Sequence, residues 1–179
     1  ADKELLSDLQ SVSDAYNNAG INIASSYLLE KMADADVETF LQLLKARGFY
    51  DASVRSEINT KDVPIELTYV FQTGDPFLLK SVTIQFSNDP GENTPRLPSI
   101  QRLGFTLGQP FSSQSVLDGQ DLLINIIRSR GFPFVKISSR DVIVDHQDQS
   151  VSVTFYIDTG PKAYFGQTIL SGLSEVKES

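Results

Sequence analysis

Apolar positions in the first part of the chain recur with the period of a helix. Over residues 2–17 they return every three or four positions with polar residues between them, which predicts an amphipathic helix. A second, short helix is expected over residues 26–32, and a third that starts at Asp34 or Asp36 and stops at Gly48. The chain therefore opens with helices alone.

Beyond Gly48 the apolar period shortens to two residues. Residues 52–59 and 65–72 both alternate between apolar and polar side chains, and a polar turn at residues 60–62 joins them. This alternation is typical of strands that bury one face. The pattern predicts an antiparallel hairpin.

The rest of the chain predicts the element order β-α-α-β-β. The expected elements are a strand, a short helix, a long helix and two strands, over residues 82–86, 98–103, 113–130, 134–144 and 151–157. The alternation slips between Ser139 and Val142, which indicates a bulge or a kink in that strand. The order is typical of a small sheet covered by helices.

Two short phrases recur along the chain in the same order. A helical run ends in Arg-Gly-Phe at Gly48 and again at Gly131, and a strand ends in Thr-Gly at Gly74 and again at Gly160. The distance between copies is nearly the same for both phrases. Internal repetition of this kind predicts modules in a row.

The repeat divides the chain into three parts. Residues 1–76 are expected to form a first module that lacks its opening strand and has an extra helix, and residues 77–161 a second, complete module. Residues 162–179 would then hold the opening strand of a third, truncated module, at 164–170. Because the first module lacks such a strand, the tail of one copy could pair with another copy and give a strand-exchanged homo-oligomer.

Composition narrows the class of protein. The chain has 179 residues, 40% hydrophobic and 21% charged, and no apolar tract long enough to span a bilayer. It has no cysteine, which excludes disulfides and thiolate chemistry, and its net charge is −8. Because its few basic residues are scattered, phosphate backbones would repel it, so nucleic acid is not expected as a partner.

The repeated phrases and the β-α-α-β-β order together resemble POTRA (polypeptide-transport-associated) domains of the BamA/TamA superfamily. The first unit is most similar to the opening module of TamA-type proteins. The resemblance implies an α+β fold of tandem modules, each a three-stranded mixed sheet with helices on one face. One departure is Pro133, where the family usually has an aromatic residue, and Phe134 could supply it.

The resemblance implies a role in outer-membrane protein assembly or translocation. The chain would lie in the periplasm, held at the outer membrane by a C-terminal barrel of the full-length protein, without enzymatic activity, metal or cofactor. Its partners would be unfolded outer-membrane or secreted polypeptides and envelope accessory subunits. The edge strands of the sheets could bind such partners by adding an extended peptide as a further strand.

By this analogy the exposed edges are residues 134–144 and 52–59. The candidate partner-binding residues on them are Val135, Lys136, Ile137, Ser138, Ser139, Arg140, Asp141, Val142, Ser53, Arg55 and Glu57. Lys136, Arg140 and Asp141 are open to a second interpretation, because charges on an edge strand also prevent aggregation.

Two other functional classes stay open. One is an envelope scaffold or spacer repeat that contacts no client, and the other is a small α+β enzyme. The single histidine, His146, lies in a polar turn, which predicts a solvated hairpin tip and no ligand site. Charge at a helix N-terminus explains Asp34, Asp36 and Glu38 better than a calcium loop does.

Glycines and aromatics at the helix ends have structural explanations too. Gly48 and Gly131 follow helices and do not precede them, so they are expected to be C-caps rather than phosphate-binding glycines. Phe49 with Tyr50, and Phe132 with Phe134, lie where a helix passes into a strand. Core packing is the expected role of both pairs.

Overall fold

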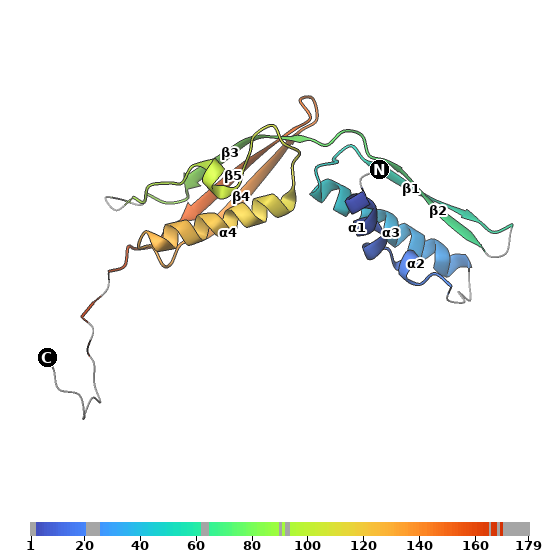
Figure 1. Cartoon of the computed structure of the whole chain (residues 1–179), viewed down its shortest axis with the longest axis horizontal. Helices are drawn as coiled ribbons and strands as arrows, with labels where there is room; N and C mark the ends of the chain where they lie inside the picture. Colours follow the sequence, from blue (N-terminus) through green and yellow to red (C-terminus); the bar gives the residue numbers. More distant parts are fainter. Residues whose placement is uncertain are drawn as a thin grey trace.

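The computed structural model describes residues 3–20, 26–61, 65–89, 91, 94–164, 166–167 and 169. Over these residues it has four α-helices, one sheet of two strands and one of three (Figure 1). This confirms the predicted α+β class. The described helices include none that is both long and apolar enough to cross a bilayer.

Five elements make up what we call the N-terminal group. They are α1 (Lys3–Val12), α2 (Asp14–Asn17), α3 (Ser26–Ala46), β1 (Ser53–Asn59) and β2 (Glu66–Gln72). The two strands are antiparallel, with Val54 opposite Phe71 and Ile58 opposite Leu67, so the predicted hairpin is confirmed. Part of its turn, like part of the strand expected at 164–170, lies outside the described residues.

The first predicted helix is interrupted at Ser13. This residue has an extended backbone (φ −83°, ψ 118°), and its hydroxyl accepts a hydrogen bond from the Tyr16 amide, which caps α2. Ser13 is also buried, because it lies against α3. A hydrogen bond to another helix therefore decides where α1 ends, and apolar periodicity carries no sign of it.

The two helices expected over 26–32 and up to Gly48 are one continuous helix, α3. Asp36 lies in its interior and is 2% exposed, so the expected cap at Asp34 or Asp36 is wrong. The Asp36 carboxylate instead accepts hydrogen bonds from other elements, which removes its usual tendency to end a helix.

The remaining elements make up what we call the C-terminal group. They are β3 (Leu78–Phe86), the 3-10 helix η2 (Ile100–Leu103), α4 (Ser113–Ser129), β4 (Lys136–Asp145) and β5 (Ser150–Asp158). The strand order is β3-β5-β4, with β3 parallel and β4 antiparallel to β5. The pairing of β4 shifts between Ile137 and Ser139, close to the predicted bulge. The β-α-α-β-β order is present.

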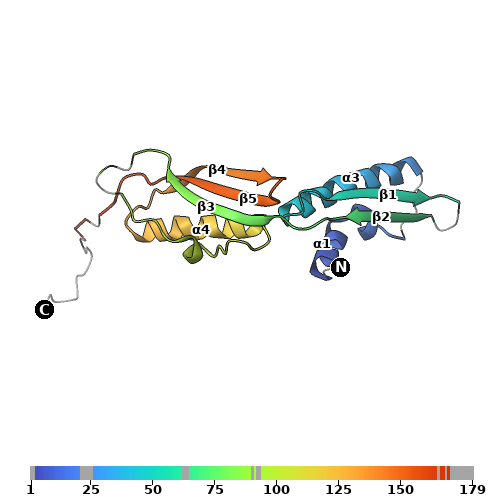
Figure 2. The same ribbon diagram turned by 90° about the horizontal axis from the view of Figure 1, so that it is seen from above.

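The core of the C-terminal group lies between the central strand and α4. The inward residues of β5, Val151, Val153, Phe155 and Ile157, are fully buried. They pack with Leu123 and Ile127 of α4, which are also fully buried. Both helices of this group cover one face of the sheet (Figures 1 and 2). The two groups follow each other end to end in Figure 2.

The groups meet at the corner where α3 passes into β1. The carbonyl of Gly48 accepts a hydrogen bond from the Phe77 amide at 2.9 Å. At the corresponding corner of the C-terminal group, the carbonyl of Gly131 accepts one from the Ala163 amide at 2.8 Å. Both glycines have positive φ, 88° and 95°, which glycine adopts with little strain. The sequence repeat is thus also a repeat of backbone geometry.

Candidate partner-binding strand edges

The sheet of the C-terminal group has two edges, β3 and β4, and they differ. The first residues of β3 are covered by the loop before α4, since the Leu79 amide donates to the Gln109 carbonyl and the Gly108 amide donates to the Leu79 carbonyl. Over the described residues, no strand pairs with the outer side of β4. The predicted edge at 134–144 is therefore an edge of the sheet.

The candidate residues of β4 lie in different surroundings. Val135 precedes the strand and is buried in the core, so its side chain is not part of an outer surface. Ser138 lies at the register shift, and its hydroxyl is 2.9 Å from that of Ser87. Ser139 is exposed and Ile137 is half-buried. Val142 is 40% exposed, which leaves apolar surface near the far end of the strand.

The charged residues of β4 all have neighbours. The Lys136 ammonium lies 3.5 Å from the carboxylate of Asp158, and Arg140 donates to the Gln120 side chain of α4 at 3.2 Å. The negative charge of Asp141 raises the pKa of Tyr156 on the neighbouring strand. These side chains are exposed. They can either attract an incoming segment or hinder edge-to-edge association.

The second predicted edge is β1, and Ser53, Arg55 and Glu57 lie on its exposed face. Arg55 and Glu57 form an ion pair at 3.1 Å on the strand surface. Their neighbours Val54 and Ile58 are half-buried. β1 pairs with β2 and, over the described residues, with no other strand. It can therefore accept a strand, but its surface is more polar than that of β4.

Asp36, in the interior of α3, has a structural role. Burial raises the pKa of Asp36, but hydrogen bonds from the Ser13 and Tyr69 hydroxyls and from the Asp14 and Ala15 amides outweigh it, so the pKa lies below its usual range. Burial and the Asp36 carboxylate raise the pKa of Tyr69. The expected place at a helix N-terminus is wrong for Asp34, Asp36 and Glu38, because α3 begins at Ser26. The Asp36 carboxylate instead lies at the N-terminus of α2, where it accepts hydrogen bonds from the Asp14 and Ala15 amides.

The corner between the groups has contacts that the sequence did not reveal. The Tyr50 ring packs on Phe77 and Phe111 at centroid distances of 5.3 and 5.9 Å. His146 is in the β4–β5 turn as predicted, but it also contacts Asp51 at 2.8 Å and the Phe77 ring at 5.3 Å. Prediction of these pairs needs the relative placement of segments far apart in sequence.

The aromatic pairs at the helix ends are confirmed in part. Phe132 is buried, and Tyr50 is half-buried in the corner, but Phe134 is 67% exposed, so core packing is wrong for it. Phe134 therefore does not replace Tyr50 at the second corner. The C-cap prediction holds for Gly48, because the Phe49 amide donates to the Leu44 carbonyl and the Gly48 amide to that of Lys45.

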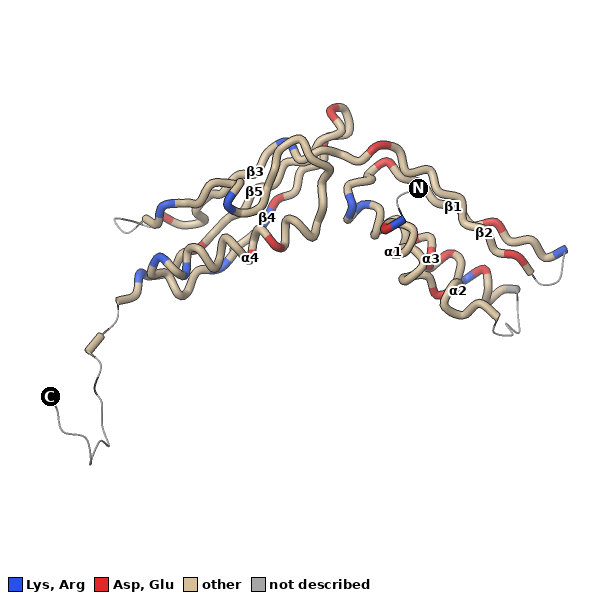
Figure 3. Tube along the Cα trace, in the orientation of Figure 1, with Lys and Arg blue, Asp and Glu red and all other residues tan. Residues whose placement is uncertain are grey.

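Charge gives neither strand edge a basic character. Figure 3 shows that acidic and basic residues are interspersed along both groups, with no run of basic residues along β1 or β4. The described residues hold no cluster of three His, Cys, Asp or Glu side chains that could bind a metal ion. What the edges offer a partner is therefore main-chain hydrogen bonding together with a few apolar and charged side chains.

Neither a protein-family model nor a curated protein matches the chain. Among solved structures it is similar to POTRA1-2 of the periplasmic domain of Omp85 from Anabaena, with 16% identity and a TM-score of 0.47, over 91% of this chain and 89% of that one. It is also similar to Haemophilus influenzae BamA POTRA3-5, with 14% identity and a TM-score of 0.43, over 80% of this chain and 64% of that one.

A third similar structure is POTRA1-3 of the Anabaena Omp85 periplasmic domain, with 16% identity and a TM-score of 0.48. The match extends over 89% of this chain and 56% of that one. The expected resemblance to POTRA domains is thus found among solved structures, and nothing in these matches singles out TamA-type proteins. The likeness is distant and concerns the fold alone.

Proposed function

We propose that this chain is a periplasmic POTRA region of an outer-membrane protein assembly or translocation factor, which binds polypeptide at a strand edge. The observation that carries the proposal is the outer side of β4, where the described residues provide no pairing strand. Such an edge presents main-chain donors and acceptors that an extended peptide can satisfy with little demand on sequence. This property suits a protein that meets many unfolded clients.

The module boundaries belong to the same proposal. Residues 1–76 and 77–161 would be two modules and residues 162–179 the start of a third. Support comes from the equivalent corner hydrogen bonds at Gly48 and Gly131. Anchorage of the full-length protein in the outer membrane, accessory subunits as further partners and the absence of catalysis are also parts of this proposal.

Site-specific photo-crosslinking tests client binding. A photoreactive amino acid replaces Ser139 or Asp141 on β4, or Arg55 on β1, and the variants are incubated with an unfolded outer-membrane barrel protein kept soluble in urea and then diluted. The matched control carries the same group at Asn125, which is exposed on α4. The proposal expects crosslinks from β4 in excess of those from Asn125.

The alternative function is a spacer repeat without client contact. It predicts equal, background crosslinking from β4, β1 and α4, and that result would overturn the proposal. Crosslinks from Arg55 but not from Ser139 or Asp141 would assign binding to β1 and contradict the role given to β4. Circular dichroism of each variant checks that the chain is folded before the crosslinks are compared.

A further inference from the structure

One edge of the N-terminal group belongs to neither candidate site. β2 pairs with β1 on one side, and among the described residues no strand pairs with its other side. Its counterpart in the repeat is β5, because each strand ends at the Thr-Gly phrase, at Gly74 and Gly160. β5 is paired on both sides, with β4 and with β3. The position that β3 takes beside β5 therefore has no counterpart beside β2.

The side chains of β2 are also less buried than those of β5. Counted back from the glycine, Leu67 corresponds to Val153, Tyr69 to Phe155 and Phe71 to Ile157. The three residues of β5 are fully buried, whereas the three of β2 are only half-buried. Ile65, just ahead of β2, is 46% exposed, while its counterpart Val151 is fully buried. The inward face of β2 thus exposes apolar surface that β3 and its neighbours cover in the other group.

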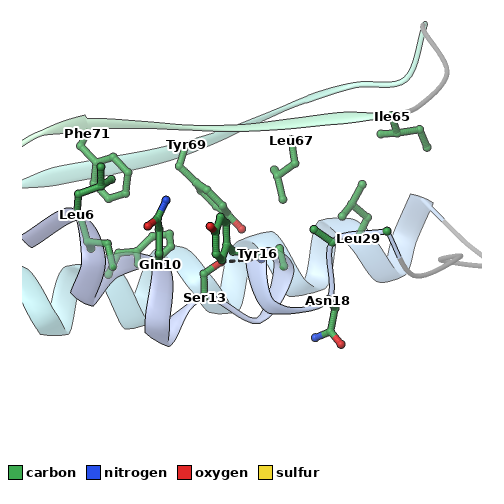
Figure 4. A pocket seen from close by; sticks show the side chains of 15 residues that line it. Leu6, Gln10, Ser13, Tyr16, Asn18, Leu29, Ile65, Leu67, Tyr69 and Phe71 are labelled. Carbon is green, nitrogen blue, oxygen red and sulfur yellow. Dashed lines mark hydrogen bonds between the residues drawn. The ribbon is translucent and has the colours of Figure 1, made fainter. Parts of the chain in front are cut away.

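This surface lines a cavity of about 690 Å³, which we call the β2 groove. Figure 4 shows Leu67, Tyr69 and Phe71 pointing from β2 toward the helices, with Leu6 and Tyr16 on the opposite wall. Leu6 and Tyr16 are 49% and 56% exposed, so the wall offers further apolar surface. The floor includes Leu29 and Phe40 of α3. The β2 groove is therefore mainly apolar and runs along a strand that is paired on one side only among the described residues.

We infer that the β2 groove binds an extended polypeptide segment of a partner, as a strand parallel to β2, with apolar residues at every second position. The direction and pattern come from the repeat. β3 runs parallel to β5, with Val82 opposite Val153, Ile84 opposite Phe155 and Phe86 opposite Ile157. A segment in the same place beside β2 would set apolar side chains opposite Leu67, Tyr69 and Phe71.

Polypeptide fits this groove better than an acyl chain or another small apolar ligand. The free side of β2 consists of amide and carbonyl groups, which an acyl chain cannot satisfy and a peptide backbone can. The inference rests on the proposed function only for the nature of the partner. It concerns a different edge, so β2 can bind a strand even if β4 and β1 bind none.

A peptide with the sequence of residues 78–86 is a suitable probe, because those residues occupy the corresponding place beside β5. Labelled with a fluorophore, it is titrated with the purified chain and its anisotropy is measured. The control peptide has aspartate at the positions of Val82, Ile84 and Phe86. The expected result is saturable binding of the first peptide and a loss of binding for the control.

Cysteine pairs test the location and direction of the peptide, since the chain has no native cysteine. Leu67→Cys and Phe71→Cys are made separately, with Thr68→Cys on the exposed side of β2 as the matched control. In a parallel arrangement, peptide cysteine at position 82 forms a disulfide with Leu67→Cys, and at position 86 with Phe71→Cys. Thr68→Cys should react with neither.

Other outcomes overturn the inference. Reversed pairs, with position 86 joined to Leu67→Cys, would contradict parallel placement, and absence of both binding and disulfides would contradict the site. A dimer detected by light scattering without peptide would identify a second copy as the occupant. A Leu67→Cys thiol already shielded in the full-length protein would identify a segment of the protein itself. Photo-crosslinking at β4 is independent of all four results.

Discussion

The carbonyl of Gly48 and the amide of Phe77 are joined by a hydrogen bond that connects the end of α3 to the start of β3. Around it, Tyr50 packs on Phe77 and Phe111, and a Cβ added to Gly48 would lie 2.8 Å from the Phe111 carbonyl oxygen. The two groups therefore meet through backbone in close contact and a small set of aromatic rings.

Gly48→Ala should destabilise the corner more than an equivalent change elsewhere. Gly74→Ala is the matched control, because Gly74 also has positive φ but its added Cβ would meet no atom within 4 Å. Both variants bear a strain of about 1 kcal/mol for a left-handed alanine. Only Gly48→Ala must also displace Phe111, so it should lower the free energy of unfolding by about 1–3 kcal/mol more than Gly74→Ala does. Urea unfolding gives both values, and equal losses would contradict close contact at the corner.

Tyr50→Ala should loosen the two groups without unfolding either. The change removes the ring that packs on Phe77 and Phe111, while the Gly48 hydrogen bond remains. NMR relaxation should then show more independent tumbling of the groups, and small-angle scattering a broader range of dimensions. Phe134→Ala is the control, since that ring is mostly exposed. Unchanged tumbling in Tyr50→Ala would show that the backbone contact alone holds the two groups in place relative to each other.

Asp36→Asn should lower the free energy of unfolding by about 3 kcal/mol near neutral pH, because a neutral amide cannot accept all four hydrogen bonds. Its folded-state pKa lies below the unfolded value of about 4, so the carboxylate stabilises the fold above that pH and less as pH falls through the folded pKa. The difference between wild type and variant should stay constant from pH 7 to about 5 and shrink below pH 4.

Denaturant unfolding at several pH values measures this difference. Asp34→Asn is the matched control, because Asp34 is exposed on the same helix and its removal should change stability by less than about 0.5 kcal/mol. A difference for Asp36→Asn that does not depend on pH between 5 and 2 would show that the charge of the carboxylate is unimportant.

Gly119→Ala should destabilise the chain although alanine is the better helix former. An added Cβ would lie 2.3 Å from the ring of Phe105, which is buried. The expected loss is about 1–3 kcal/mol, since overpacking outweighs about 1 kcal/mol of helix propensity. Phe105→Leu replaces the ring with a smaller side chain that lacks the crowded ring atoms, so the double variant should be more stable than the sum of the two losses predicts. Additive losses would contradict the contact.

The hairpin of β1 and β2 could be predicted because a period of two residues is a local property. The break at Ser13 and the continuity of α3 could not. Both depend on Asp36, whose partners Ser13, Asp14 and Tyr69 are 22 to 33 residues away along the chain. In the local sequence, an aspartate that accepts hydrogen bonds from distant residues looks the same as an aspartate that caps a helix. Local signals therefore cannot distinguish the two roles.

The candidate edges show the same division. The place of β4 at the edge of its sheet was predicted from the resemblance to POTRA domains, and the strand order β3-β5-β4 agrees with it. β4 begins at Lys136, two residues later than predicted, so Phe134 and Val135 lie ahead of the strand and alternation does not fix which of them is buried. The half-buried face of β2 was not evident either, because its residues alternate like those of β5.

Each corner has the same kind of main-chain hydrogen bond, from an amide to a glycine carbonyl. The amide belongs to Phe77 in one corner and to Ala163 in the other, so the side chain of the donor residue is large in one case and small in the other. A joint specified by a glycine carbonyl and an amide does not constrain the residue that supplies the amide. The surfaces on either side can therefore diverge during evolution while the path of the chain through the joint is inherited unchanged. Successive repeats could therefore evolve new binding surfaces while the connection between one repeat and the next stays the same.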